Sequence, residues 1–166
     1  MMGTLGYPIL INPSRVFTIM ELAPHIENYR QAWREAGHEG KGQVGLRVPI
    51  YVADTAEQAY SEPEASAMFS AHRLGARVGS YATYGGTTGD WQAESDRILG
   101  MSYDDWLRDK VVYGTAGAVT DRLTEIQEAL NLDQFMFEVN YGSQIPQERQ
   151  HKSLKLFMEN VAPSFR

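Results

Sequence analysis

The chain has 166 residues, the size of one ordinary domain, and we expect a single domain over residues 1–166. Its formal net charge of −6 argues against a nucleic-acid partner, which would require a basic surface. It contains no cysteine, which excludes disulfides and thiolate metal sites. No apolar run approaches the roughly 20 residues that span a bilayer, so we expect no membrane partner. The N-terminal residues lack the pattern of a signal peptide, and a cytoplasmic location is the expectation.

Three short apolar runs have the composition and length of β-strands. They are residues 7–12, 44–53 and 134–141, each rich in β-branched or aromatic types and each closed by a residue that breaks strands. No further strand is predicted.

Helical patterns separate these runs. We predict helices from Pro24 to Ala36, from about residue 55 to Leu74 with a break near 62 as an alternative, from Ser102 to Lys110, and from Thr115 to Leu130. A capping box at Thr18 and Glu21 could start the first helix earlier, but Pro24 would then interrupt it. A last helix begins at Pro146, with Leu154, Phe157, Met158 and Val161 facing inward.

Alternation of strands and helices predicts an α/β fold of parallel βαβ units with right-handed crossovers. Residues 76–100 differ from the rest because they combine several glycines with aromatic residues, and we expect a long flexible insertion there. Two interpretations stay open for this glycine- and aromatic-rich segment: a lid or partner-contact segment, or a plain flexible loop.

The second and third strands each have one aliphatic or aromatic face and one face with polar residues. Side chains alternate along a strand, which places Arg47 opposite the Leu46 face and Glu138 opposite the Phe135, Phe137, Val139 and Tyr141 face. If the two strands are neighbours, Arg47 and Glu138 can form an ion pair, since a charge removed from water needs a partner. Such a pair suits the polar lumen of a parallel barrel better than a sheet covered by helices on both faces. A structural ion pair is the preferred interpretation, and a direct role in binding is the alternative.

The rest of the sequence carries no specific catalytic or metal-binding motif. The Gly114–Gly117 segment lacks the lysine of a phosphate-binding P-loop, and Thr115 reads as a plain helix cap. The four histidines have no spacing typical of metal ligands, so no metal is predicted.

In parallel α/β folds, ligand-binding residues follow the carboxyl ends of strands. Here those positions are Asn12, Ser14, Asn140, Tyr141 and Gly142, and they are our candidate cofactor-binding residues. Asn140 is the first choice because it shares the face of Glu138. Asp54 also follows a strand, but it is better explained as a residue at the start of a helix.

The order of several short motifs resembles the C-terminal part of the bacterial luciferase-like monooxygenases, which are flavin- or deazaflavin-dependent (β/α)8 barrels. The motifs are YRQAW at 29–33, AGH at 36–38, YVADT at 51–55, EQA at 57–59, VYGT at 112–115, DRL at 121–123, LNL at 130–132, PQE at 146–148, SLKLF at 153–157 and VAP at 161–163. The resemblance implies a partial TIM barrel whose three predicted strands correspond to the sixth, seventh and eighth. It also implies FMN or a deazaflavin as cofactor.

A complete barrel needs about 250 residues and eight strands. The strands that carry the family's catalytic residues have no counterpart here, so the catalytic residues stay unknown. Three parallel strands leave open edges, and we expect a homo-oligomer or a second chain that supplies the missing half, with Pro8, Leu10, Tyr51 and Met136 at the interface.

Two functions follow from the resemblance. The first is part of a flavin-dependent luciferase-like monooxygenase that is inactive alone. The second is a non-catalytic half-barrel that binds no cofactor and self-associates or serves as an interaction subunit.

Overall fold

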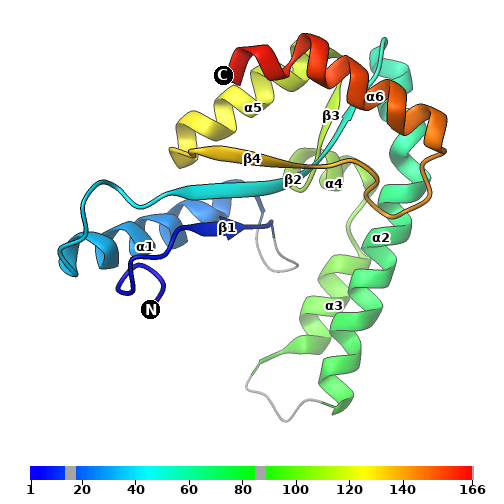
Figure 1. The fold of residues 1–166 in the computed structure, drawn as a ribbon. Coiled ribbons are helices and arrows are strands. Elements are labelled where there is room, and N and C mark those ends of the chain that lie inside the picture. Colours follow the sequence, from blue (N-terminus) through cyan, green and yellow to red (C-terminus); the bar gives the residue numbers. More distant parts are fainter. Residues whose placement is uncertain (14–17, 85–88, 166) are drawn as a thin grey trace.

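The computed structural model describes residues 1–13, 18–84 and 89–165. Figure 1 shows a small sheet, helices packed against it, and the long helix α2, which projects away from the sheet with the shorter α3 beside it. In chain order the elements are β1 (Ile9–Ile11), η1 (Met20–Leu22), α1 (Ala23–Glu35), β2 (Val44–Val52), α2 (Ala56–Tyr84), α3 (Trp91–Leu99), α4 (Tyr103–Asp109), β3 (Val112–Gly114), α5 (Ala116–Leu130), β4 (Gln134–Glu138), α6 (Gln147–Asn160) and η2 (Ala162–Phe165).

Within the described residues the sheet has four strands, all parallel, and β2 pairs with each of the other three. Ile9 is in register with Val44, Ile50 with Val112, and Gly45 with Gln134. The predicted α/β class and the pairing of the second predicted strand with the third are therefore confirmed. The structure adds a fourth strand, β3, to the three that the sequence predicts. This strand has three residues, too few to show an alternating pattern.

The aliphatic face of β2 carries the main core. Leu46, Val48, Ile50 and Val52 are at most 1% exposed and pack with apolar residues of α1, α5 and the segment after α6. Phe135 and Phe137 of β4 pack against the same cluster, as the predicted alternation requires. The sheet therefore buries one face under α1, α5 and α6 and leaves the Arg47 face to a different environment.

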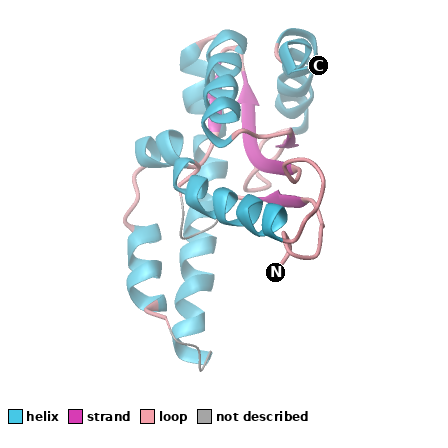
Figure 2. Ribbon diagram, turned by 90° about the vertical axis from the view of Figure 1, so that its left-hand side faces the viewer, coloured by secondary structure: helices cyan, strands magenta, loops and turns pink. Residues whose placement is uncertain are grey.

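On the other side, α2, α3 and α4 form a second apolar cluster. Ala71, Val78, Ile98, Tyr103 and Trp106 are buried there. Figure 2 shows α2 and α3 side by side as a pair of helices that extends away from the sheet.

The predicted long loop over 76–100 is wrong for most of its length. The helix predicted to end at Leu74 continues to Tyr84, with Pro63 inside it, and α3 occupies Trp91–Leu99. Gly75 and Gly79 permit this pairing of helices. A Cβ built on Gly75 would lie 2.7 Å from Leu99 side-chain atoms, and one on Gly79 would lie 2.9 Å from the Ser95 hydroxyl.

The other predicted helices are found with boundaries within a few residues. Ser102 and Asp105 form a capping box at α4, and Thr115 caps α5. Thr18 and Glu21 do exchange capping hydrogen bonds, but they start the short turn η1 rather than α1. In α6, the prediction that Leu154 and Met158 face inward is wrong: they are 36% and 48% exposed. Among the helices described, none is long and apolar enough to cross a membrane.

Candidate functional site

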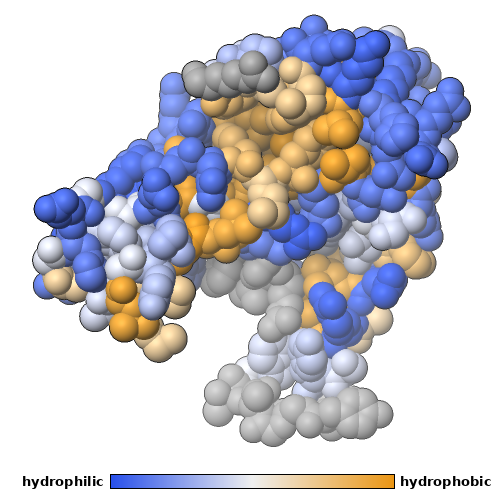
Figure 3. Space-filling model, viewed as in Figure 1, coloured by the Kyte–Doolittle hydropathy of each residue, from blue (hydrophilic) through white to orange (hydrophobic). Residues whose placement is uncertain are grey.

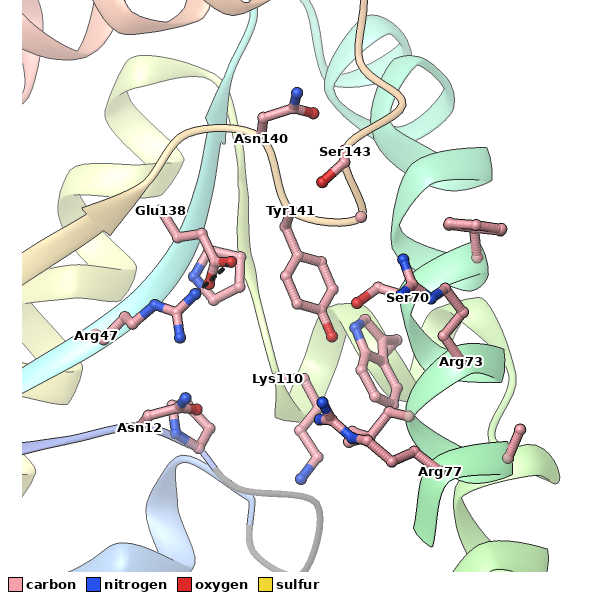
Figure 4. A pocket seen from close by; sticks show the side chains of 17 residues that line it. Asn12, Arg47, Ser70, Arg73, Arg77, Lys110, Glu138, Asn140, Tyr141 and Ser143 are labelled. Carbon is pink, nitrogen blue, oxygen red and sulfur yellow. Dashed lines mark hydrogen bonds and ion pairs between the residues drawn. The ribbon is translucent and has the colours of Figure 1, made fainter. Parts of the chain in front are cut away.

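A pocket of about 1030 Å³ lies between the Arg47 face of the sheet and helix α2. Its walls come from the end of β1, the middle of β2, the end of β4, the loop 140–143, and helices α2 and α4. Figure 4 shows the polar and charged side chains of these elements around one shared space. The volume is at the upper end of the range of about 300–1,000 Å³ that small-molecule and cofactor sites occupy.

The structure brings four of the five candidate residues together. Asn12, Asn140, Tyr141 and Gly142 all line this pocket. Ser14 lies outside the described residues. Asp54 lies elsewhere, as expected of a residue before α2: its carboxylate is 2.5 Å from the ammonium group of Lys152 on α6.

The ion pair expected between Arg47 and Glu138 is present. Arg47 Nη2 donates to Glu138 Oε1 at 2.7 Å, which joins β2 to β4 on the pocket side. The Asn12 amide, with its oxygen turned toward Arg47, accepts from Arg47 Nη1 at 3.3 Å. These contacts link the three strands that form one wall of the pocket.

The loop after β4 is held by helix α2. The Ser66 hydroxyl donates to the Tyr141 carbonyl at 2.6 Å and accepts from the Gln144 amide at 3.0 Å. Gly142 has φ +88°, and a Cβ there would collide with the Ser66 carbonyl oxygen. This glycine is therefore required by its contact with α2, which is a structural reason separate from any bound ligand.

Asn140 and Tyr141 have different roles from those the alternation predicts. Asn140 Oδ1 accepts from the Ile145 amide at 3.1 Å, so the amide group stabilises the loop. β4 ends at Glu138, so Tyr141 does not share the face of Phe135 and Phe137. Its ring instead stacks on Trp106, with centroids 6.4 Å apart, and points into the pocket (Figure 4). Burial raises the pKa of the Tyr141 phenol.

Sequence reasoning missed the basic side of the pocket. Arg73 and Arg77 extend from α2, and Lys110 follows α4 (Figure 4). Lys110 is only 4% exposed, and burial, with Arg97 as the next cause, lowers its pKa to about 8, although Glu94 acts in the opposite direction. The signal available was the spacing of Phe69, Arg73 and Arg77 by four residues, but Arg77 fell in the segment predicted to be a loop.

Among the described residues, no group of three or more histidine, aspartate or glutamate side chains is placed to hold a metal ion. The polar groups that line the pocket are guanidinium, ammonium, amide, indole and hydroxyl groups that can donate, with one carboxylate that accepts. This set suits an organic ligand with an anionic group better than a metal.

Several solved structures resemble this chain in fold. The oxygenating constituent of 3,6-diketocamphane monooxygenase from Pseudomonas putida, solved with FMN, superposes with a TM-score of 0.70 at 19% identity. Monooxygenase RslO1 from Streptomyces bottropensis gives 0.64 at 17%, and the coenzyme F420-dependent tetrahydromethanopterin reductase from Methanopyrus kandleri gives 0.63 at 17%. The chain has the fold of part of a luciferase-like monooxygenase.

The luciferase-like fold is only partly present in this chain. Each of these three superpositions covers 99% of the chain, but only 44%, 44% and 47% of the respective neighbours. The open four-stranded sheet of the described residues agrees with that share, since a closed barrel of this type has eight strands. No protein-family model and no curated protein sequence matches the chain.

Proposed function

We propose that this chain is part of a flavin- or deazaflavin-dependent luciferase-like monooxygenase and contributes one wall of its ligand pocket. The observation that carries the proposal is the pocket on the inner face of a parallel sheet whose fold is shared with proteins that use FMN or F420. A bound reduced flavin would supply the activation of molecular oxygen in such an enzyme.

The residues of the pocket fit a flavin in two respects. Basic groups on α2 and after α4 suit its phosphate, and the Tyr141 and Trp106 rings offer an aromatic wall. The amides of Asn12 and Asn140 add hydrogen-bonding groups near the sheet. The chain's own contribution is then to bind and orient the cofactor and to exclude water from one side of it.

The proposal predicts that the chain changes its thermal unfolding when FMN or F420 is added, because a ligand that binds the folded state stabilises it. FMN fluorescence should fall on titration with protein. Ser70→Trp would fill the pocket and should abolish both effects, whereas Ser80→Trp, on the exposed part of the same helix, should leave them unchanged. If neither FMN nor F420 alters melting or fluorescence, the cofactor-free alternative is the better explanation.

A second candidate function is an interaction subunit, and the exposed edges of the sheet favour it. β4 and β1 each pair only with β2 among the described strands, so each has an unpaired side. Leu10 and Met136 on these strands are 47% and 48% exposed. Figure 3 shows apolar surface in the region where Figure 1 places β4.

We propose that a chain that supplies further barrel strands, or a second copy of this chain, covers these edges. Tyr51 is not available for such an interface, contrary to the sequence expectation. It is 2% exposed and its hydroxyl donates to Glu62 on α2 at 2.5 Å. Light scattering at micromolar concentration tests association directly, and a monomer at every concentration would count against it.

A further inference from the structure

The charge of the pocket wall is opposite to that of the whole chain. The chain carries a net charge of −6, yet the pocket lining has Arg47, Arg73, Arg77 and Lys110 against a single acid, Glu138. Glu138 already pairs with Arg47 at 2.7 Å. The lining therefore adds three more cationic side chains, those of Arg73, Arg77 and Lys110, and Glu138 is the one acid among the described residues that line it.

The two arginines of α2 differ from the other arginines in their contacts. Arg30, Arg34, Arg97, Arg108, Arg122 and Arg149 each lie within 4.0 Å of a carboxylate. Among the described residues, neither Arg73 nor Arg77 has an ion pair, and the guanidinium carbon of Arg73 lies 5.6 Å from the centre of the Phe69 ring. Like charges four residues apart destabilise an isolated helix, so this pair has no evident benefit for folding.

Lys110 completes the group from a different element. It follows α4 and is 4% exposed, so its ammonium group is held close to the pocket wall rather than in bulk water. The charged groups that act on it are Arg97, Glu94, Asp109 and Glu21.

We propose that Arg73, Arg77 and Lys110 bind a tetrahedral oxyanion, a phosphate or sulfonate group. Guanidinium groups bind such anions through paired N–H donors, and the ammonium group adds a point charge. The Ser70 hydroxyl on the same wall is a further donor. The inference deepens the proposed function and rests on it for the source of the anion, which is either the phosphate of the flavin or an anionic group of the substrate.

The test uses inorganic phosphate as the probe on the 166-residue chain. Isothermal titration should give a saturable Kd that weakens by about tenfold or more in Arg73→Gln/Arg77→Gln, since charge-assisted hydrogen bonds of this kind are lost. Arg34→Gln/Lys155→Gln removes the same charge at exposed sites on α1 and α6, where the side chains are 55% and 73% exposed, and should leave the Kd unchanged. Equal Kd values for both double variants would overturn the proposal.

A second measurement keeps the test valid if the α2 variant does not fold. Phenylglyoxal modifies exposed arginines, and phosphate should protect Arg73 and Arg77 of the unaltered chain while Arg34 stays reactive, as read by peptide mass spectrometry. No selective protection at phosphate concentrations that saturate binding would contradict the proposal.

FMN and riboflavin distinguish the two sources of the anion. If FMN displaces phosphate and riboflavin does not, the group bound is the flavin's own phosphate. If FMN binds and phosphate still binds equally well, the group belongs to the substrate. Phosphate binding without any flavin binding would support this site and contradict the proposed function. If flavin binds but the α2 substitutions leave the phosphate affinity unchanged, the result supports the proposed function and contradicts this anion site.

Discussion

Arg47 on β2 and Glu138 on β4 form a 2.7 Å ion pair although they are not opposite each other in the sheet. The residue in register with Arg47 is Met136, and the residue in register with Glu138 is Pro49. The two side chains therefore meet along the diagonal between neighbouring strands, on the face that lines the pocket.

This pairing predicts non-additive destabilisation. The side chains are 41% and 23% exposed, so solvent screens them and a double-mutant cycle of Arg47→Ala and Glu138→Ala should give a coupling of only about 0.5–1 kcal/mol. Urea denaturation of the four proteins measures it. The pair of Arg34 and Glu27, with side chains 55% and 63% exposed, is the reference and should give a smaller coupling. Strict additivity at Arg47 and Glu138 would show that the contact is not formed in solution.

Gly142→Ala should destabilise the chain by at least about 2 kcal/mol, because a left-handed backbone is unfavourable for alanine and the new Cβ would collide with Ser66. Gly117→Ala is the matched control. Gly117 lies in the first turn of α5 with nothing within 4 Å of its Cβ position, and alanine there should be neutral or stabilising by up to about 1 kcal/mol. Equal stability of Gly142→Ala and the unaltered chain would contradict the contact between the loop and α2.

The lowered pKa of Lys110 predicts that the free energy of unfolding rises with pH. Its pKa is about 8 in the folded state and about 10.5 when unfolded, so between these values the unfolded chain binds more protons. The free energy of unfolding should then increase from pH 8 to 10, by at most about 1.4 kcal/mol per pH unit. Above pH 10 the buried tyrosines act in the opposite direction, because burial raises the pKa values of Tyr103 and Tyr113.

The contribution of Lys110 is measured as the difference between the unaltered chain and Lys110→Met. The methionine variant should be more stable below pH 8, since it removes the burial of a charge, and the difference should shrink as the pH rises to 10. Parallel stability profiles would mean that Lys110 titrates at its ordinary pKa in the folded chain.

If the chain associates through the edges of its sheet, carboxylates introduced on β1 and β4 should weaken that association. Leu10→Glu with Met136→Glu should shift any oligomer toward monomer in analytical ultracentrifugation, because a carboxylate at a buried contact loses its hydration. Met158→Glu on α6 is the control, since Met158 is 48% exposed, as Met136 is, but lies on a different element. An equal response of both variants would place the contact elsewhere.

Much of the fold could be read from local sequence signals. The helix caps at Ser102 and Thr115 are defined by hydrogen bonds within four residues, and the alternation in β2 reports directly which side chains are buried. Local signals do not predict the α2–α3 pair, because Gly75 and Gly79 pack against residues that are distant from them in the sequence. Their lack of a side chain permits contact with Leu99 and Ser95, and a local reading interprets the same glycines of this stretch as helix breakers.

The candidate site was predicted only where strands end. Asn12, Tyr141 and Gly142 were found because the carboxyl ends of parallel strands converge. Arg73 and Arg77 lie on a helix that returns over the inner face of the sheet, and nothing local indicates that α2 takes this path. Lys110 was missed for the same reason, since its burial depends on tertiary packing against the pocket wall.

Every strand pairing in the described part of the chain involves β2. Residues 44–52 are synthesised long before residues 112–114 and 134–138, with which they form backbone hydrogen bonds in the sheet. Because contacts between distant positions slow folding, a nascent chain would carry an incompletely bonded and strongly apolar segment until residues 134–138 have emerged. We expect refolding yields to depend on temperature and protein concentration, and chaperones that shield extended apolar segments to improve them.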